Sequence, residues 1–167
     1  MSIPTIRPSR EADVPAIADI YAHYVNTALA TFETEAPDTA EIARRRQAIL
    51  ELGLPYLVAE IDGIVAGYAY AGPYRPRPAY RFTVEDSVYI RPQYVGKGLG
   101  KLLLNDLIAG CTNAGCTQMV AIIGDSENRA SIGLNRGLGF REVGVLRSVG
   151  FKFDQWVDTV LMQRRLG

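Results

Sequence analysis

The chain has 167 residues, 48% of them hydrophobic, and its 18 lysine and arginine residues balance 18 aspartate and glutamate residues. This length suffices for one domain with a full core. The net charge is zero and the charged residues are spread along the chain, which argues against a nucleic-acid partner. No apolar stretch has membrane-spanning length and the N-terminal residues are not typical of a signal peptide, so we expect a soluble protein of the cytoplasm.

The first half of the chain predicts a strand, two helices and a hairpin. Residues 3–8 form the expected strand, and the next apolar residues recur at helical spacing after a candidate N-cap at Asp13. That helix is expected to bury Val14, Ile17, Ala18, Tyr21 and Val25. A second helix is predicted over 38–52, ended by Gly53, and strands over 56–61 and 65–71 flank an Asp62-Gly63 turn.

The second half alternates strands and helices. A strand over 83–90 leads into a glycine loop and a helix that begins near Lys97. The fully apolar residues 119–123 indicate a strand in a sheet that is covered on both faces. A short helix over 128–138 and strands over 143–146 and 157–162 complete an α/β order in one packed domain.

The loop after the predicted strand at 83–90 is the clearest functional signal. Gln93, Gly96 and Gly98 match the pattern Gln/Arg-x-x-Gly-x-Gly/Ala directly before a helix. Glycines allow the backbone to approach an anion, and the free amides of a helix start favour negative charge. A Walker A loop is excluded because Lys101-Leu102 follows the last glycine, and a dinucleotide fingerprint is disfavoured by the mid-chain position.

This loop resembles the acetyl-CoA pyrophosphate loop of the GCN5-related N-acetyltransferases (GNAT), and the order of elements is similar across nearly the whole chain. Four strings resemble the phosphinothricin and methionine-sulfoximine acetyltransferases of that family: TFETE at 31–35, YAYAGPY at 68–74, YRFTVEDSVY at 80–89 and VGFKFDQW at 149–156. The resemblance implies one domain over 1–167, with a mixed, mostly antiparallel sheet flanked by helices. It also implies acetyl-CoA as co-substrate and a homodimer.

The same resemblance assigns the cofactor residues. The pantetheine arm is expected beside Val88, Tyr89 and Ile90, and Asn128 is expected to bond this arm as well as to cap its helix. The pyrophosphate is expected at the backbone amides of Val95, Gly96, Lys97, Gly98, Leu99 and Gly100. Lys101 either adds charge there or is a solvated helix lysine.

Glu85 is the leading candidate for the catalytic residue, as a general base that accepts the proton of the substrate ammonium directly or through water. Partial burial would raise its pKa and suit it to neutral pH. Asp86 is the less favoured candidate. Alternation along the strand leaves open whether Glu85 lies on the face opposite Val88 and Ile90.

Asn135 departs from the family, in which a tyrosine or a histidine stands near the cofactor sulfur. An asparagine donates a hydrogen bond but is no acid near neutral pH, which questions any scheme with a side-chain acid at this position. For the acceptor, the proline-stiffened Arg75 and Arg77 suit a carboxylate, with surface charge as the alternative. Phe32 and Tyr80 are candidate pocket walls or packed aromatics.

Together these features predict an acetyl-CoA-dependent N-acetyltransferase acting on the α-amino group of a small L-amino-acid analogue, such as phosphinothricin, methionine sulfoximine or methionine sulfone. Transfer would be direct, within a ternary complex. Two alternatives remain: another amine, namely a polyamine, an aminoglycoside or a protein N-terminus, and a non-catalytic acyl-CoA-binding regulator. Cys111, Cys116 and the single histidine His23 make no metal set, so no metal is expected, and both cysteines are expected as free thiols.

Overall fold

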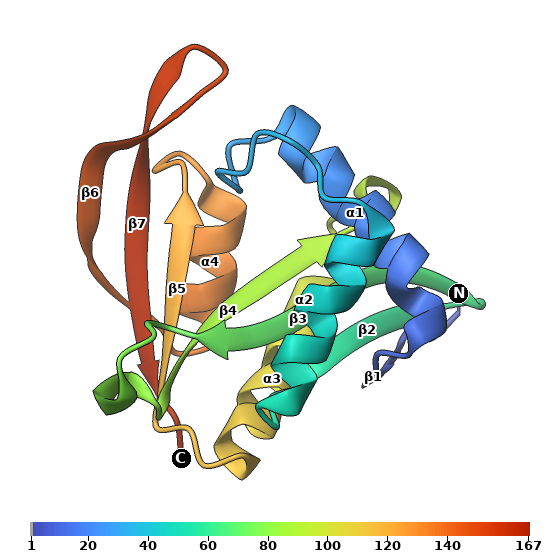
Figure 1. Ribbon diagram of the computed structural model, residues 1–167. Coiled ribbons are helices and arrows are strands. Elements are labelled where there is room, and N and C mark those ends of the chain that lie inside the picture. The colour runs from blue at the N-terminus through green and yellow to red at the C-terminus, as the bar shows by residue number, and fades with distance from the viewer. Residues whose placement is uncertain (1) are drawn as a thin grey trace.

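One seven-stranded sheet, in the order β1-β2-β3-β4-β5-β7-β6, organises the protein (Figure 1), whose computed structural model describes residues 2–167. Its strands are β1 (Thr5–Pro8), β2 (Tyr56–Ile61), β3 (Ile64–Pro73), β4 (Thr83–Ile90), β5 (Gln118–Gly124), β6 (Arg141–Lys152) and β7 (Gln155–Arg165). The helices are α1 (Val14–Thr27), α2 (Thr39–Glu51), α3 (Leu99–Asn113) and α4 (Arg129–Gly137). Every strand pair is antiparallel except β4–β5, which confirms the predicted mixed, mostly antiparallel α/β fold.

Two apolar clusters cover the two faces of the sheet. On one face, α1 and α2 pack through residues such as Ile17 and Ile42 against Tyr68 of β3. On the other face, α3 packs through residues such as Leu103 against Met119 of β5. Successive side chains of a strand point to opposite faces, so β3 and β4 contribute alternate residues to both clusters. None of the helices described in residues 2–167 is long and apolar enough to cross a membrane.

The β4 and β5 strands pair for only a short distance. Their parallel register covers Thr83, Val84 and Glu85 against Gln118, Met119 and Val120, while β4 continues to Ile90 beside β3 and β5 continues to Gly124 beside β7. The two strands diverge beyond this point, as Figure 1 shows. The edge of β4 beyond Glu85 therefore has backbone groups that β5 does not pair.

Several local predictions are confirmed. Asp62 and Gly63 have φ angles of 51° and 77°, as a tight hairpin turn requires. The helix predicted over 38–52 is α2, and Asp38 stands just before it as its N-cap, accepting the Glu41 amide proton at 2.8 Å. Cys111 and Cys116 are both free and buried.

The structure corrects other predictions. The α3 helix begins at Leu99 rather than near Lys97, because Gly98 takes a left-handed conformation with φ of 80°. The β6 and β7 strands form one long hairpin that includes most of 147–156, which was not predicted as strand. The β5 strand is not covered on both faces: Ile122 is 41% exposed because it faces the cleft described below.

Asp13 stands at the predicted N-cap position of α1, but its side chain does not cap that helix. Its carboxylate instead accepts two hydrogen bonds from the Arg7 guanidinium, at 2.8 and 2.9 Å, and one from the Arg10 amide at 2.7 Å. Arg7 Nε also donates to Glu60 on β2 at 2.9 Å. These largely buried ion pairs connect β1 to the start of α1 and to β2. The hydrogen bonds from Arg7 hold the pKa of Asp13 below its usual range.

We predict that Asp13→Asn lowers the free energy of unfolding by about 1.5–3 kcal/mol at pH 7, because it removes the charge that accepts two of the hydrogen bonds of Arg7 and leaves Glu60 as its one anionic partner. Since the folded pKa is lowered, this contribution is complete above the ordinary value of 3.8 and is lost as the pH falls through the folded pKa. Urea unfolding at several pH values measures the effect. Asp19→Asn is the control: its ion pair with Arg91 leaves Asp19 70% exposed, and we expect a loss of about 1 kcal/mol or less.

Candidate active site

A cleft of about 650 Å³ opens where β4 and β5 diverge. Its walls come from β4, β5, α1, α4 and the segment between α1 and α2. The lining includes these residues: Tyr21, Tyr24, Thr31, Phe32, Tyr70, Glu85, Asp86, Val88, Tyr89, Ile90, Val95, Gly100, Ile122, Gly124, Asn128, Ser131, Leu134, Asn135 and Thr159. Of the residues predicted for the site, the cleft thus contains Glu85, the β4 edge, both ends of the glycine loop, both asparagines and Phe32.

The side-chain alternation along β4 answers the question that the sequence left open. Val88 and Ile90 pack with the α3 cluster, whereas Tyr89 packs with the α1–α2 cluster. Glu85 lies four residues before Tyr89 and therefore points to the same face of the sheet. Its charge contributes to the raised pKa of Tyr70, which packs with the α1–α2 cluster, so Glu85 faces α1 and α2. Asp86 has the parity of Val88 and Ile90 and faces α3, close enough to Cys111 for its ionised form to raise the pKa of that thiol. The two neighbouring carboxyl groups therefore meet different sides of the sheet.

Glu85 and Asp86 also differ in charge state. Burial raises the pKa of Glu85 above its ordinary value of 4.5. Burial, with a smaller contribution from the nearby Glu85 charge, raises the pKa of Asp86 to about 8. Asp86 Oδ2 is buried and has no hydrogen-bond partner in residues 2–167, which fits a carboxyl group that is mainly protonated at neutral pH. Glu85 is then the member of the pair that is ready to accept a proton.

Asn135 and Asn128 form the α4 wall of the cleft. Asn128 caps the helix by accepting the Ser131 amide proton at 3.2 Å. Asn135 is 5% exposed, and its Nδ2 donates to the Ser131 carbonyl at 2.9 Å. Asn135 Oδ1 is buried without a partner in the described part of the chain, so it is an acceptor available to a donor within the cleft.

The glycine loop leads from β4 to α3 in the conformation that an anion site needs. Gly96 and Gly98 have φ angles of 82° and 80°, and no heavy atom lies within 4 Å of a Cβ built on either. Val95 and Gly100 line the cleft, while Lys97 and Lys101 are exposed beside the loop. Open glycines, the amides at the α3 start and the unpaired β4 edge fit the pyrophosphate and pantetheine arm of acetyl-CoA.

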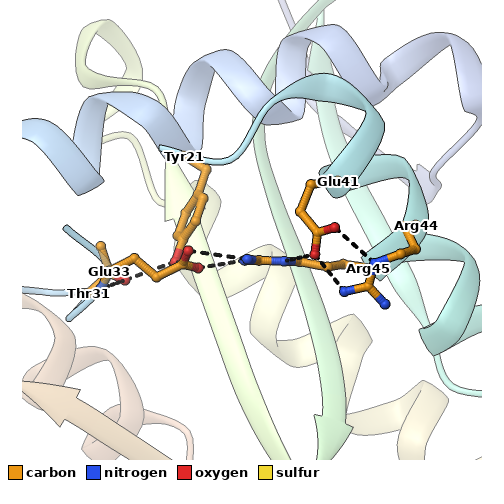
Figure 2. Close-up of polar contacts among 6 residues, drawn as sticks. All are labelled: Tyr21, Thr31, Glu33, Glu41, Arg44 and Arg45. Atoms are coloured by element: carbon orange, nitrogen blue, oxygen red, sulfur yellow. Dashed lines mark hydrogen bonds and ion pairs between the residues drawn. The ribbon is translucent and has the colours of Figure 1, made fainter. Parts of the chain in front are cut away.

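The segment between α1 and α2 closes the α1–α2 side of the cleft. The Tyr21 hydroxyl donates to Glu33 Oε1 at 2.6 Å, and the Thr31 hydroxyl lies 2.9 Å from the same tyrosine oxygen. Arg45 on α2 donates to both Glu33 oxygens, as Figure 2 shows. These contacts hold the segment so that Phe32, which is 38% exposed, faces the cleft.

Arg75, Arg77 and Tyr80 do not line the cleft of their own chain. They are exposed in the loop between β3 and β4, where the Arg75 guanidinium lies 5.1 Å from the centre of the Tyr74 ring. The Tyr74 and Tyr80 rings pack edge to face at 5.5 Å. This loop precedes β4, at the end opposite to the divergence from β5 (Figure 1). Arg75 and Arg77 therefore do not bind an acceptor carboxylate in the cleft of their own chain.

The fold and the cleft fit an acetyltransferase. The chain belongs to the acetyltransferase (GNAT) family, whose family model matches residues 17–140. It is 56% identical over 162 residues to the phosphinothricin N-acetyltransferase of Alcaligenes faecalis, covering 97% of this chain and 82% of the relative. It is 42% identical over 162 residues to the L-methionine sulfoximine/L-methionine sulfone acetyltransferase of Salmonella typhimurium, covering 97% and 94%.

Among solved structures, the GNAT phosphinothricin acetyltransferase of Sinorhizobium meliloti in complex with acetyl-CoA superposes with a TM-score of 0.96 at 45% identity, covering 100% of this chain and 90% of that chain. The protein is therefore an acetyl-CoA-dependent N-acetyltransferase, as predicted, and the alternative of a non-catalytic regulator is not supported. Residues 2–167 contain no group of three or more side chains that could hold a metal ion.

Sequence reasoning missed part of this site. Tyr21 was predicted as a core residue of α1, and Thr31 has no signal of its own beyond the family resemblance at 31–35, although both line the cleft. Ile122 looked like a core residue because its strand is fully apolar. The separation of Asp86 from Glu85 has a sequence signal, since neighbouring residues of a regular strand point to opposite faces.

We predict that Glu85→Gln lowers kcat by about 10²–10⁴-fold, because the amide cannot accept the ammonium proton. The acetyl-CoA dissociation constant should stay unchanged, since Glu85 faces away from α3. In the wild type, kcat should rise with pH through an apparent pKa above the ordinary glutamate value of 4.5, and this limb should vanish in the variant. Steady-state kinetics against pH, with calorimetry for acetyl-CoA, make the test. Unchanged turnover would remove Glu85 from the base role.

Proposed function

We propose that the acceptor is the α-amino group of a small L-amino-acid analogue of the phosphinothricin, methionine sulfoximine or methionine sulfone type. The observation that carries the proposal is the pair of neighbouring carboxyl groups in the cleft, with Glu85 poised as a base on the α1–α2 side. The names of the relatives at 56% and 42% identity supply the acceptor class.

Each part of the cleft has a task in direct transfer within a ternary complex. Acetyl-CoA supplies the acetyl group as a thioester. The β4 edge and the glycine loop hold the cofactor arm and pyrophosphate, while Glu85 takes the proton of the acceptor ammonium so that the neutral amine can attack. Asn135 orients polar groups by hydrogen bonds but supplies no proton near neutral pH, so the departing sulfur takes its proton from water.

A homodimer is part of the proposal, and an exposed apolar surface supports it. The β6–β7 hairpin exposes about half or more of each of these side chains: Val143, Leu146, Val149, Phe151, Phe153 and Trp156. The Phe151 and Trp156 rings lie 4.9 Å apart. An apolar patch on an edge hairpin is typical of a protein–protein contact. In such an assembly Arg75 and Arg77 meet the acceptor carboxylate in the cleft of a second subunit. The cytoplasmic location stays a prediction.

The acceptor assignment predicts saturable thiol release from acetyl-CoA with phosphinothricin, methionine sulfoximine and methionine sulfone. Spermidine and a short peptide should give no turnover above the rate without acceptor, because the carboxylate next to Phe32, that of Glu33, is already bonded by Tyr21 and Arg45 and is not free to bind a further cation. A thiol-detecting assay at fixed acetyl-CoA makes the comparison. Turnover with spermidine or the peptide alone would move the function to those acceptors.

The dimer assignment predicts that Phe151→Ser combined with Trp156→Ser yields a monomer in sedimentation velocity, because the substitutions remove two of the largest exposed apolar side chains of the hairpin. Leu52→Ser is the matched control: Leu52 is 59% exposed at the end of α2, and its loss should leave the dimer intact. A monomeric wild-type protein at micromolar concentration would contradict the proposal.

A further inference from the structure

The segment from Ala28 to Glu33, which we name the acceptor wall, is held by a strand more than a hundred residues later in the chain. Ala30, Thr31 and Phe32 of this wall line the cleft. The wall has no helix or strand of its own beyond the end of α1, so other elements must fix its position. The last residues of β6 contact it from the sheet side.

Lys152, the last residue of β6, reaches the wall with its ammonium group. It is 3% exposed, and its Nζ donates to the carbonyl oxygens of Ala28 and Thr31 at 2.7 Å each. Burial lowers the pKa of Lys152, and the charge of the nearby Glu33 opposes that shift. A buried ammonium needs such acceptors, and the hydrogen bonds of a charged donor are strong. One side chain thus holds both ends of a four-residue turn.

Gly150, two residues earlier on the same strand, leaves the space that the Phe32 ring fills. A Cβ built on Gly150 would lie 2.3, 2.6 and 2.8 Å from three carbon atoms of that ring. Gly124 on β5 approaches the wall in the same way, since its Cβ would lie 2.3 Å from the Leu29 carbonyl oxygen. By contrast, no atom lies within 4 Å of a Cβ built on Gly144, also on β6. The glycines at 124 and 150 therefore set how closely the wall packs on the sheet.

The other side of the wall is fixed as well. Glu33 accepts hydrogen bonds from Tyr21 and from Nη1 and Nη2 of Arg45, and Figure 2 shows these contacts converging on the end of the wall. Hydrogen bonding from Arg45 lowers the pKa of Glu33, so the carboxylate stays charged at neutral pH. Phe32 is consequently confined between β6 and the cleft, and any group added at position 150 pushes the ring into the cleft.

We propose that Gly150 and Lys152 determine acceptor specificity: Gly150 sets the depth of the acceptor end of the cleft through Phe32, and Lys152 positions the acceptor wall through the carbonyls of Ala28 and Thr31. Neither residue lines the cleft, so both act through the wall. The inference rests on the proposed placement of the acceptor on the α1–α2 side. It assigns the discrimination between acceptors to the β6–β7 hairpin.

Gly150→Ala tests the first half. We expect the KM for phosphinothricin to rise about tenfold or more, because the displaced ring occupies acceptor space, while the KM for acetyl-CoA stays within about twofold. Gly144→Ala, on the same strand with open space, should change neither. The double variant Gly150→Ala with Phe32→Ala should behave like Phe32→Ala alone, since the colliding ring is gone. An unchanged acceptor KM in Gly150→Ala, or independent effects in the double variant, overturns the assignment of Gly150.

Lys152→Met tests the second half by a measurement that does not need turnover. We expect amide hydrogen exchange of residues 28–33 to accelerate about tenfold or more, because the wall loses its buried donor. Exchange in α3 should be unchanged, which excludes general unfolding. Arg147→Met, at an exposed position of β6, is the control. Unchanged exchange in the wall overturns the role of Lys152. A wild type without turnover on amino-acid analogues refutes the proposed function, while this exchange result still stands.

Discussion

The early divergence of β4 and β5 is the constraint on which the rest of the structure depends. Parallel pairing stops at Glu85 and Val120, although both strands continue. Backbone N–H and C=O groups need hydrogen-bond partners, so the free edge of β4 is available to the extended cofactor arm that we propose there. The same divergence opens the cleft, exposes Ile122 in an otherwise buried strand and leaves α4 to form the far wall. A sheet that stayed paired would have no site.

The chemistry of the site follows from the position of the last paired residues. Glu85 stands at the point where pairing ends, facing α1 and α2, and Asp86 stands one residue later facing α3. Because strand neighbours alternate, two adjacent carboxyl groups enter different surroundings. Asp86 Oδ2 is buried without a hydrogen-bond partner in the described residues, and burial raises the pKa of Asp86 to about 8, so Asp86 holds its proton and Glu85 is the better proton acceptor. In the proposed mechanism the pKa shifts that burial causes suit Glu85 to act as the base, so the transfer requires neither a metal ion nor a nucleophilic side chain.

The acceptor side of the cleft depends on contacts between distant parts of the chain. Lys152 bonds carbonyls 124 and 121 residues away in sequence, and Gly150 makes room for Phe32. The proposed cofactor side, by contrast, comes mainly from the continuous stretch of β4, the glycine loop and α3, joined by Asn128 at the start of α4. The hairpin that carries Gly150 and Lys152 lies outside the continuous segment proposed for the cofactor. It also places the surface proposed for the dimer next to the wall that shapes the acceptor end.

The amino-acid sequence by itself determined the order of elements, the Asp62-Gly63 hairpin, the cap at Asn128 and the glycine loop, because each depends on residues within a few positions of one another. Local signals also placed Glu85 in a strand that leads to that loop. Only the tertiary structure decided which face Glu85 meets, that Asp13 bonds Arg7 instead of capping α1, and that Arg75 and Arg77 lie outside their own cleft. It alone joined Lys152 to the acceptor wall. Burial and long-range contacts set these features, and neither is encoded in the spacing of neighbouring residues.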